Sequence, residues 1–218
     1  RPTAAEVGLM KKGAILLSII EPYLNDGLLE KLAGAGVETF ALELVPRTSR
    51  AQSMDVLSSQ ANIAGYRAVL EGAARYRRFF PLIMTSACSA KAAKVFVLGV
   101  GVAGLQAIAT AKRLGAAVMA YDVRPETKEQ IVSLGGKPFE VQLEESGSGT
   151  GGYAKELSEA SKKKLQAALA EQISKSDVII CTANVPGRKA PTLVAEDVVK
   201  AMRAGSVIVD MAAQSGGN

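Results

Sequence analysis

Two kinds of apolar pattern alternate along the chain. Longer stretches with helical periodicity or helix-capping residues predict helices over residues 25–36, 103–115, 126–135, 153–174 and 195–202. Short apolar runs predict strands over residues 13–20, 37–44, 94–99, 116–122, 136–141, 176–183 and 206–212. Strands that are apolar throughout are typical of parallel sheets covered by helices on both faces. The pattern therefore predicts an α/β fold with a doubly wound parallel sheet.

One longer helix is expected to divide the chain. From about residue 55 to residue 80, Ile63 and Leu70 recur at helical spacing, while Arg67 and Glu71 mark the opposite face. Such a helix is long enough to reach from one domain to another. We predict an incomplete smaller α/β domain in residues 1–55, an interdomain helix in residues 56–80 and a second α/β domain in residues 81–218.

Composition and charge argue against two classes of protein. Hydrophobic residues make up 48% and charged residues 22% of the sequence, which is typical of a globular chain. No apolar run approaches the roughly 20 residues that span a bilayer, so we expect the segment itself to be soluble. The net charge of +5 is spread along the sequence, and few aromatic residues accompany the basic ones. No nucleic-acid partner is therefore predicted.

The chain lacks the usual residues of metal and acid–base chemistry. It contains no histidine, which is the commonest metal ligand and the commonest general base near neutral pH. Cys88 and Cys181 are far apart and belong to no CxxC pattern, which indicates neither a metal site nor a disulfide framework. We expect a reducing compartment, no bound metal and a reaction that needs no histidine.

The sharpest local motif is LGVGVAG, where Gly99, Gly101 and Gly104 form GxGxxG between a predicted strand and a predicted helix. The first glycine permits a tight turn, the second lets backbone approach a pyrophosphate, and the third lets helix pack on strand. Asp122 ends the next strand about 20 residues on, where a carboxylate can bind the adenosine ribose. Residues 81–218 are thus predicted to be a Rossmann domain. Because Asp122 would repel a 2′-phosphate, NAD(H) is favoured over NADP(H).

Further candidate residues are expected at the same end of the sheet. Arg124 could accept the 2′-phosphate of NADP(H) or could instead pair with surface acids. The glycine-rich stretch GSGTGGYAKE is either a flexible linker or a lid that Tyr153 helps to close. The Thr85 region and TANVPGRKAP follow two further strands. The predicted cofactor-binding residues are Gly99, Gly101, Val102, Ala103, Gly104, Asp122, Val123, Arg124, Tyr153, Thr182 and Ala183.

Four stretches together carry a family resemblance: VPRTSRAQSMDVLSSQANIAGYRAVLEGA, VFVLGVGVAGLQAIATAKRLGAAVMAYDVR, GGYAKE and GSVIVDMAAQSGGN. They are similar to the NAD(H)-binding domain I, within the alpha subunit, of proton-translocating nicotinamide nucleotide transhydrogenase. The resemblance covers nearly the whole chain. The related alanine dehydrogenases share the two-domain fold but not the Arg-Gln-Asp-Ser pattern of the first stretch.

The resemblance implies a reaction and its residues. Hydride would pass directly from NADH on this domain to NADP⁺ on a separate domain III, and a membrane domain II would couple the transfer to proton movement. Asp55 and Ser58 would hold the nicotinamide carboxamide, Arg47 would steady the ring region, and Gln52 would reach towards the second nucleotide. This cluster would lie at the cleft between the two domains. A plainer interpretation is helix capping by Asp55 or Ser53.

The resemblance also implies a role for the nucleotide-binding residues and a cellular setting. Asp122 would take the adenosine ribose, and Tyr153 would belong to a mobile loop that folds over the nucleotide. A homodimer is implied, peripheral to a membrane on the cytoplasmic side in bacteria or the matrix side in mitochondria. We expect the rest of the smaller domain to lie outside residues 1–218.

Two alternatives remain open from the sequence. The chain could belong to an alanine-dehydrogenase-like enzyme, although that family uses a histidine acid/base that this sequence lacks. It could instead be a nucleotide-sensing module with no chemistry of its own. Transfer of labelled hydride from NADH to an NADP⁺ analogue would separate these alternatives.

Overall fold

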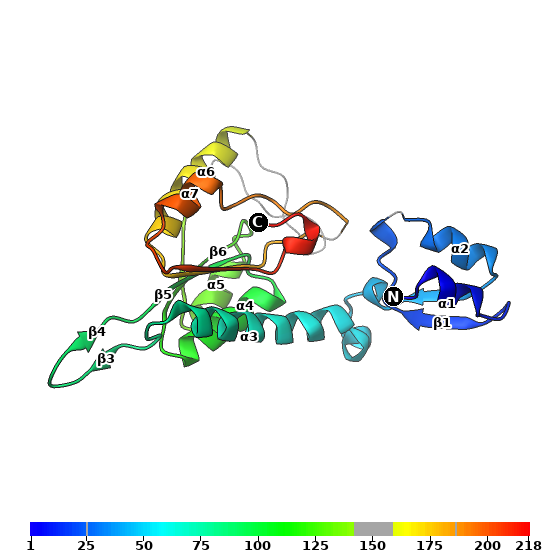
Figure 1. Cartoon of the computed structure of the whole chain (residues 1–218), viewed down its shortest axis with the longest axis horizontal. Coiled ribbons are helices and arrows are strands. Elements are labelled where there is room, and N and C mark those ends of the chain that lie inside the picture. The colour runs from blue at the N-terminus through cyan, green and yellow to red at the C-terminus, as the bar shows by residue number, and fades with distance from the viewer. Residues whose placement is uncertain (25, 142–158, 186) are drawn as a thin grey trace. The chain divides into compact units, whose positions relative to one another are not determined.

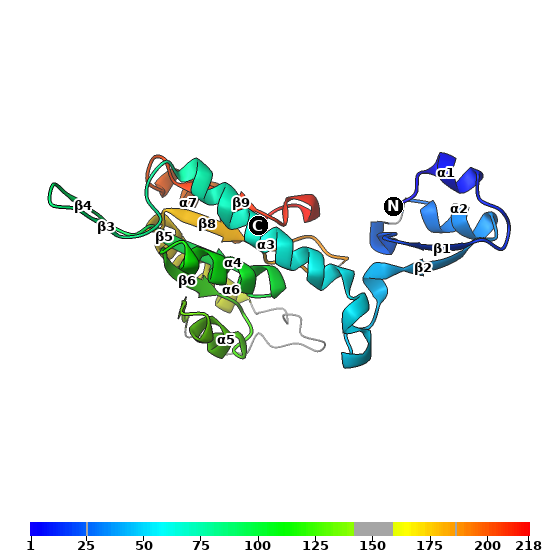
Figure 2. The same cartoon turned by 90° about the horizontal axis from the view of Figure 1, so that it is seen from below.

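A computed structural model describes residues 1–24, 26–141, 159–185 and 187–218. The chain forms two compact units, Arg1–Gln60 (unit 1) and Ala61–Asn218 (unit 2). Figures 1 and 2 show the elements of each unit from two directions. Each unit has its own buried apolar core, so each is described by itself.

Unit 1 contains the strand–helix–strand order that the sequence predicts. Strands β1 (Ile15–Ser18) and β2 (Glu38–Ala41) pair in parallel, and helix α2 (Leu28–Gly34) lies between them in sequence. Short 3-10 helices cover Pro22–Leu24, Leu42–Leu44 and Ser49–Met54. The core consists of Val7, Ile20, Leu28, Leu32 and Val37.

Helix α1 (Ala4–Gly8) is absent from the sequence prediction. The Glu6 N–H donates to Thr3 Oγ1 at 3.3 Å, and the Thr3 N–H donates to Glu6 Oε2 at 2.7 Å. This reciprocal pair is a capping box, so its Thr-x-x-Glu signature is readable in the sequence. The helix buries Val7 against the core of unit 1.

Unit 2 contains a five-stranded parallel sheet in the order β7-β6-β5-β8-β9. In order of appearance along the chain this is 3-2-1-4-5, the order of a dinucleotide-binding Rossmann sheet. The predicted α/β fold with a doubly wound parallel sheet is confirmed. The strands are β5 (Lys94–Leu98), β6 (Ala117–Tyr121), β7 (Lys137–Pro138), β8 (Val178–Cys181) and β9 (Val207–Asp210).

Helices cover both faces of this sheet, as Figure 1 shows. Alternate residues of β5 point to opposite faces. Val95 and Val97 join the core covered by α3 (Val56–Tyr76) and α4 (Val102–Arg113). Phe96 and Leu98 join the core covered by α6 (Glu159–Ser174) and α7 (Glu196–Ala201). All four side chains are buried, which is why the strand reads as a continuous apolar run. Helix α5 (Thr127–Ser133) adds Ile131 to the first of these cores.

Helix α3 (Val56–Tyr76) differs from its prediction in length and in its buried face. It ends at Tyr76 rather than near residue 80, because Arg77 adopts a left-handed φ of 55° that stops the helix. Ile63, which the pattern places on the apolar face, is 58% exposed. The buried positions recur at helical spacing, and they are Gly65, Ala68, Val69, Gly72 and Tyr76.

Small residues on this face let α3 pack closely against its neighbours. A Cβ atom placed on Gly65 would lie 2.1 Å from the carbonyl oxygen of Ala103, in the first turn of α4. A Cβ atom on Gly72 would lie 3.1 Å from a methyl group of Val178. A hydrophobicity pattern assigns the buried face of a helix to its large apolar side chains. It therefore predicts the wrong buried face for a helix that packs through glycine.

A short hairpin extends from unit 2, formed by antiparallel strands β3 (Ile83–Met84) and β4 (Ser89–Ala90). Figures 1 and 2 both show it projecting away from the sheet. Met84 is 74% exposed on it. Among the described residues, no helix combines the length and the apolar character that a bilayer crossing requires.

The two cysteines are both free thiols. Cys88 is exposed in the turn of the hairpin, directly before β4, whereas Cys181 ends β8 inside the core. Burial, helped by the negative charge of Asp210, raises the pKa of the Cys181 thiol to about 12. Cys181 therefore stays protonated at neutral pH and acts as a small apolar core residue.

The contact of Gly65 predicts a specific stability effect. Gly65→Ala should lower the free energy of unfolding by about 1–3 kcal/mol, because the methyl group meets a main-chain carbonyl that cannot rotate away. Gly72→Ala is the matched control in the same helix, and it should cost less because its neighbour is a side-chain methyl. Chemical denaturation of both variants measures the difference. Equal stability of the two variants would contradict this packing.

Candidate functional site

The candidate site lies where strands β5 and β8 end side by side. The chain leaves β5 into α4 on one face of the sheet and leaves β8 towards α7 on the other face. In an open α/β sheet such a switch point leaves a crevice outside the carboxyl ends of the strands, where ligands bind. The GxGxxG turn and the TANVPGRKAP loop follow these two strands, so the structure brings two predicted motifs together.

Two glycines of the motif are required by close packing. Gly99 has a left-handed φ of 91°, and a Cβ atom on it would lie 2.7 Å from the amide nitrogen of Ala183. A Cβ atom on Gly104 would lie 2.0 Å from the carbonyl oxygen of Gly99. No larger residue fits at either position without moving backbone, so these glycines set the turn itself.

Gly101 is different, because space lies open beside it. It is the N-cap residue of α4 and has an extended backbone, with φ −81° and ψ −164°. Among the described residues, a Cβ atom on Gly101 would meet no atom within 4 Å, and no side chain caps the helix there. The first N–H groups of α4 have no acceptor within the helix and lie at the positive end of its dipole. The arrangement suits an anionic group that approaches the backbone closely.

Thr182 fixes the turn from the neighbouring strand. Its backbone N–H donates to Leu98 O at 2.8 Å, which extends the β5–β8 pairing by one residue. Its hydroxyl donates to Gly99 O at 2.8 Å. The sequence predicts Thr182 as a site residue but does not show that its side chain holds the first glycine of the motif.

Asn218 holds the loop after β8, and the sequence does not single it out. Its Nδ2 donates to Ala183 O at 2.7 Å and to Pro191 O at 3.0 Å. Its backbone N–H donates to the carboxylate of Asp210, at the end of β9, at 2.9 Å. The only signal in the sequence is the family-like stretch GSVIVDMAAQSGGN, which ends in this residue but assigns it no contact.

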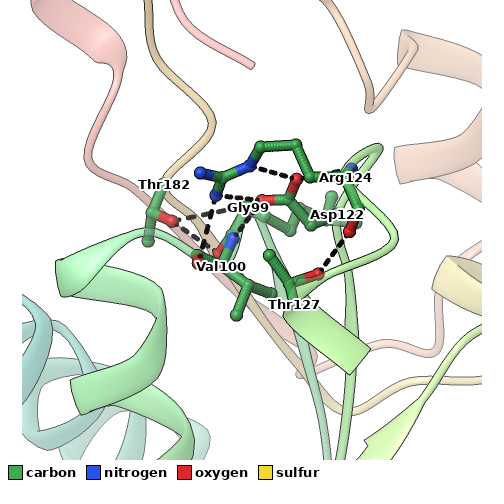
Figure 3. Close-up of polar contacts among 7 residues, drawn as sticks. Gly99, Val100, Asp122, Arg124, Thr127 and Thr182 are labelled. Atoms are coloured by element: carbon green, nitrogen blue, oxygen red, sulfur yellow. Dashed lines mark hydrogen bonds and ion pairs between the residues drawn. The ribbon is translucent and has the colours of Figure 1, made fainter. Parts of the chain in front are cut away.

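Asp122 follows β6 and lies beside the turn, as predicted. Its Oδ2 accepts the Val100 N–H at 2.7 Å, and its two oxygens accept Nε and Nη2 of Arg124, each at 2.9 Å. Figure 3 shows the guanidinium lying along this carboxylate. The hydrogen bonds from Arg124 to Asp122 raise the pKa of Arg124. Of the two interpretations of Arg124, pairing with an acid holds, but its partner is Asp122 itself.

The predicted nicotinamide residues lie in unit 1 and at the start of α3. Asp55 accepts the Ser58 N–H at 2.9 Å and the Ser58 hydroxyl at 2.6 Å. Asp55 therefore caps α3, which confirms the plainer interpretation for this residue. These two hydrogen bonds lead the causes that lower the pKa of Asp55, and the charge of Arg47 adds to them. Gln52 and Arg47 are exposed.

The other predicted residues have different outcomes. Val102 and Ala103 form the first turn of α4, next to Gly101, and Val123 is half-buried between Asp122 and Arg124. Tyr153 and the whole glycine-rich stretch lie outside the described residues. The structure thus groups the glycine turn, Asp122, Arg124, Thr182 and Ala183 in unit 2, and Asp55 with Ser58 at the start of α3.

Two family models match the chain. Residues 1–64 match the family described as alanine dehydrogenase/PNT, N-terminal domain, and residues 68–218 match alanine dehydrogenase/PNT, C-terminal domain. Together the two matches cover nearly the whole chain.

Comparison with individual proteins shows the same similarity to transhydrogenases and alanine dehydrogenases. The chain is 52% identical to a polypeptide of NAD(P) transhydrogenase subunit alpha from Rhodospirillum rubrum, over 98% of this chain and 56% of that protein. It matches the crystal structure of transhydrogenase from Sinorhizobium meliloti with a TM-score of 0.86 and 49% identity, over 100% of this chain and 58% of that one. It is 27% identical to alanine dehydrogenase of Bacillus subtilis, over 99% of this chain and 52% of that enzyme. The chain spans about half the length of these relatives.

The glycine geometry predicts that two substitutions separate folding from ligand binding. Gly101→Ala should leave the unfolding temperature unchanged, because its methyl group enters open space, and should weaken NADH binding about tenfold or more by blocking the backbone approach. Gly104→Ala should destabilise the protein, because its methyl group meets Gly99 O. Thermal unfolding and NADH titration of both variants test this. Normal NADH affinity in a folded Gly101→Ala protein would contradict it.

Proposed function

Because the chain belongs to the alanine dehydrogenase/PNT family, we propose that it is the NAD(H)-binding part of a proton-translocating NAD(P) transhydrogenase. NADH bound here gives hydride directly to NADP⁺ held by a partner domain III, and a membrane domain II couples the transfer to proton movement. The higher identity to transhydrogenases than to alanine dehydrogenase supports this choice. The absence of histidine from the sequence supports it too.

The observation that carries the proposal is the open space at Gly101, at the N-terminus of α4. A pyrophosphate needs N–H donors, positive potential and a backbone without a side chain in its path. The turn supplies all three, with Gly99 and Gly104 packed tightly and Gly101 open. In this proposal Val102 and Ala103 donate their N–H groups to the pyrophosphate. Thr182 and Ala183 form the opposite wall.

Asp122 takes the adenosine ribose in this proposal. Its carboxylate follows β6 and is already fixed by the N–H of Val100, within the glycine turn. The pyrophosphate donors and the ribose acceptor are therefore held in one rigid arrangement. Val123 and Arg124 border the same position.

Asp55 and Ser58 hold the nicotinamide carboxamide. The lowered pKa keeps Asp55 ionised at neutral pH, so its oxygens only accept hydrogen bonds. Ser58 donates one hydrogen bond to each oxygen, and the Leu57 N–H also donates to the carboxylate. About four lone-pair positions are available on the two oxygens, so one remains for an amide N–H. Arg47 steadies the ring region, and Gln52 reaches towards NADP(H) on the partner. Tyr153 closes over the bound nucleotide.

This reaction suits a chain without histidine. A hydride, which is a proton with two electrons, leaves C4 of the dihydronicotinamide of NADH and bonds to C4 of the nicotinamide of NADP⁺, giving NAD⁺ and NADPH. No proton passes through a protein side chain in this step. The residues of the chain need only bind and align one ring against the other and exclude water.

The cellular setting is also part of the proposal. The chain acts as a homodimer peripheral to a membrane, on the cytoplasmic side in bacteria or the matrix side in mitochondria. The NADP(H) of the reaction is held by domain III and not by this chain.

Labelled hydride tests the proposal. The protein is incubated with NADH carrying deuterium at C4 and with an NADP⁺ analogue, with and without domain III, and the reduced analogue is analysed by mass spectrometry. We expect stereospecific deuterium transfer only when domain III is present. Oxidation of NADH by pyruvate and ammonia, with no transfer to the analogue, would instead identify an alanine dehydrogenase. NADH binding without either reaction would identify a binding module.

Gln52→Asn sharpens the same measurement. Its shortened side chain should slow deuterium transfer at saturating NADH while leaving the Kd for NADH nearly unchanged, because its proposed contact is with the second nucleotide. Gln60→Asn is the matched control, since Gln60 is also exposed and has no proposed role. Equal loss of NADH affinity and transfer rate in Gln52→Asn would rule out this role for Gln52.

A further inference from the structure

The carboxylate of Asp122 is fully occupied within the protein. It accepts one hydrogen bond from Val100 and three from Arg124, whose backbone N–H, Nε and Nη2 each lie 2.9 Å away, while the Val100 N–H lies at 2.7 Å. Two carboxylate oxygens offer about four lone-pair positions. The Asp122 side chain is only 8% exposed. An added donor must therefore replace one that is already present.

The donors differ in how easily they can leave. The Val100 N–H belongs to the tight turn after Gly99. The backbone of Arg124 is held by Thr127, whose buried hydroxyl donates to Arg124 O at 2.7 Å. Both main-chain donors are thus fixed. Only Nε and Nη2, at the end of a flexible side chain, can move away from Asp122.

Nε and Nη2 of Arg124 bind the same carboxylate oxygens of Asp122 that a ribose would bind. A guanidinium presents two neighbouring N–H groups to the two oxygens of a carboxylate. The 2′- and 3′-hydroxyls of an adenosine ribose present two neighbouring O–H groups to the same oxygens. Nη2 of Arg124 also donates to Val100 O at 3.2 Å, which draws the guanidinium across the turn. Figure 3 shows this position of the side chain.

We propose that Arg124 is a specificity-determining residue that competes with the ribose hydroxyls of NAD(H) for Asp122 and, once displaced, offers its charge to a 2′-phosphate. The inference rests on the proposed NAD(H) site and concerns its selectivity. A lone carboxylate would favour NAD(H) strongly and repel NADP(H). The Arg124–Asp122 ion pair weakens the preference for NAD(H), because the ribose hydroxyls must displace Arg124. It also weakens the repulsion of NADP(H), because the 2′-phosphate meets a carboxylate whose charge Arg124 neutralises.

Opposite changes in the affinities for two nucleotides test the inference. NADH and NADPH are titrated separately into wild-type protein, Arg124→Gln and Arg124→Lys, with binding followed by nucleotide fluorescence. In Arg124→Gln, loss of a charge-assisted hydrogen-bond fork should tighten NADH binding and weaken NADPH binding, each by up to about tenfold. Arg124→Lys should retain NADPH binding, because it keeps the positive charge, and should bind NADH more tightly than wild type, because it lacks the fork.

The controls separate this role from a structural one. Lys128→Gln removes the same charge four residues away, where Lys128 pairs with Glu140 at 3.3 Å on the surface, and should change neither affinity. Unfolding temperatures show whether each variant is folded. If NADH and NADPH affinities fall together in folded Arg124→Gln, or if neither changes, the inference is wrong although the proposed function stands. If wild-type protein binds no NADH, both are wrong.

Discussion

The end of strand β5 has no room for a side chain, and the rest of unit 2 is arranged around that restriction. Gly99 meets the backbone of Ala183, Gly104 meets the carbonyl of Gly99, and Gly65 meets the carbonyl of Ala103. The main chains of β5, α4, α3 and the loop after β8 therefore lie in close contact. Gly101, in the same turn, faces open space within the described structure. Among the described residues, Gly101 is therefore the glycine of this turn beside which an anion can reach the backbone.

Much of the fold is predictable because buried parallel strands leave a strong pattern. The runs at β5, β6, β8 and β9 are apolar on both faces, and the helices between them repeat at helical spacing. The pattern fails where packing does not depend on apolar side chains. The inward face of α3 is built on Gly65 and Gly72, so the pattern places Ile63 on the wrong side. The end of α3 is set by the left-handed backbone of Arg77, which the apolar pattern does not reveal.

The residues of the candidate site are predictable from the sequence, but the contacts between them are less so. The glycines and Asp122 follow from a spacing that reflects a local turn. The pairing of Arg124 with Asp122 depends on how the chain turns after β6, and the support from Asn218 joins residues far apart in sequence. Neither contact can be read from residue types alone. The roles of Arg47, Gln52, Asp55 and Ser58 come from family resemblance, and the structure adds that Asp55 and Ser58 hold each other.

In the proposed complex, the open side of the turn at Gly101 receives the pyrophosphate of NADH. A crystal structure of the protein with NADH bound tests this most directly. We predict pyrophosphate oxygens within hydrogen-bond distance of the first N–H groups of α4 and no side chain between them and Gly101. A nucleotide bound elsewhere, with this turn still open, would contradict the claim.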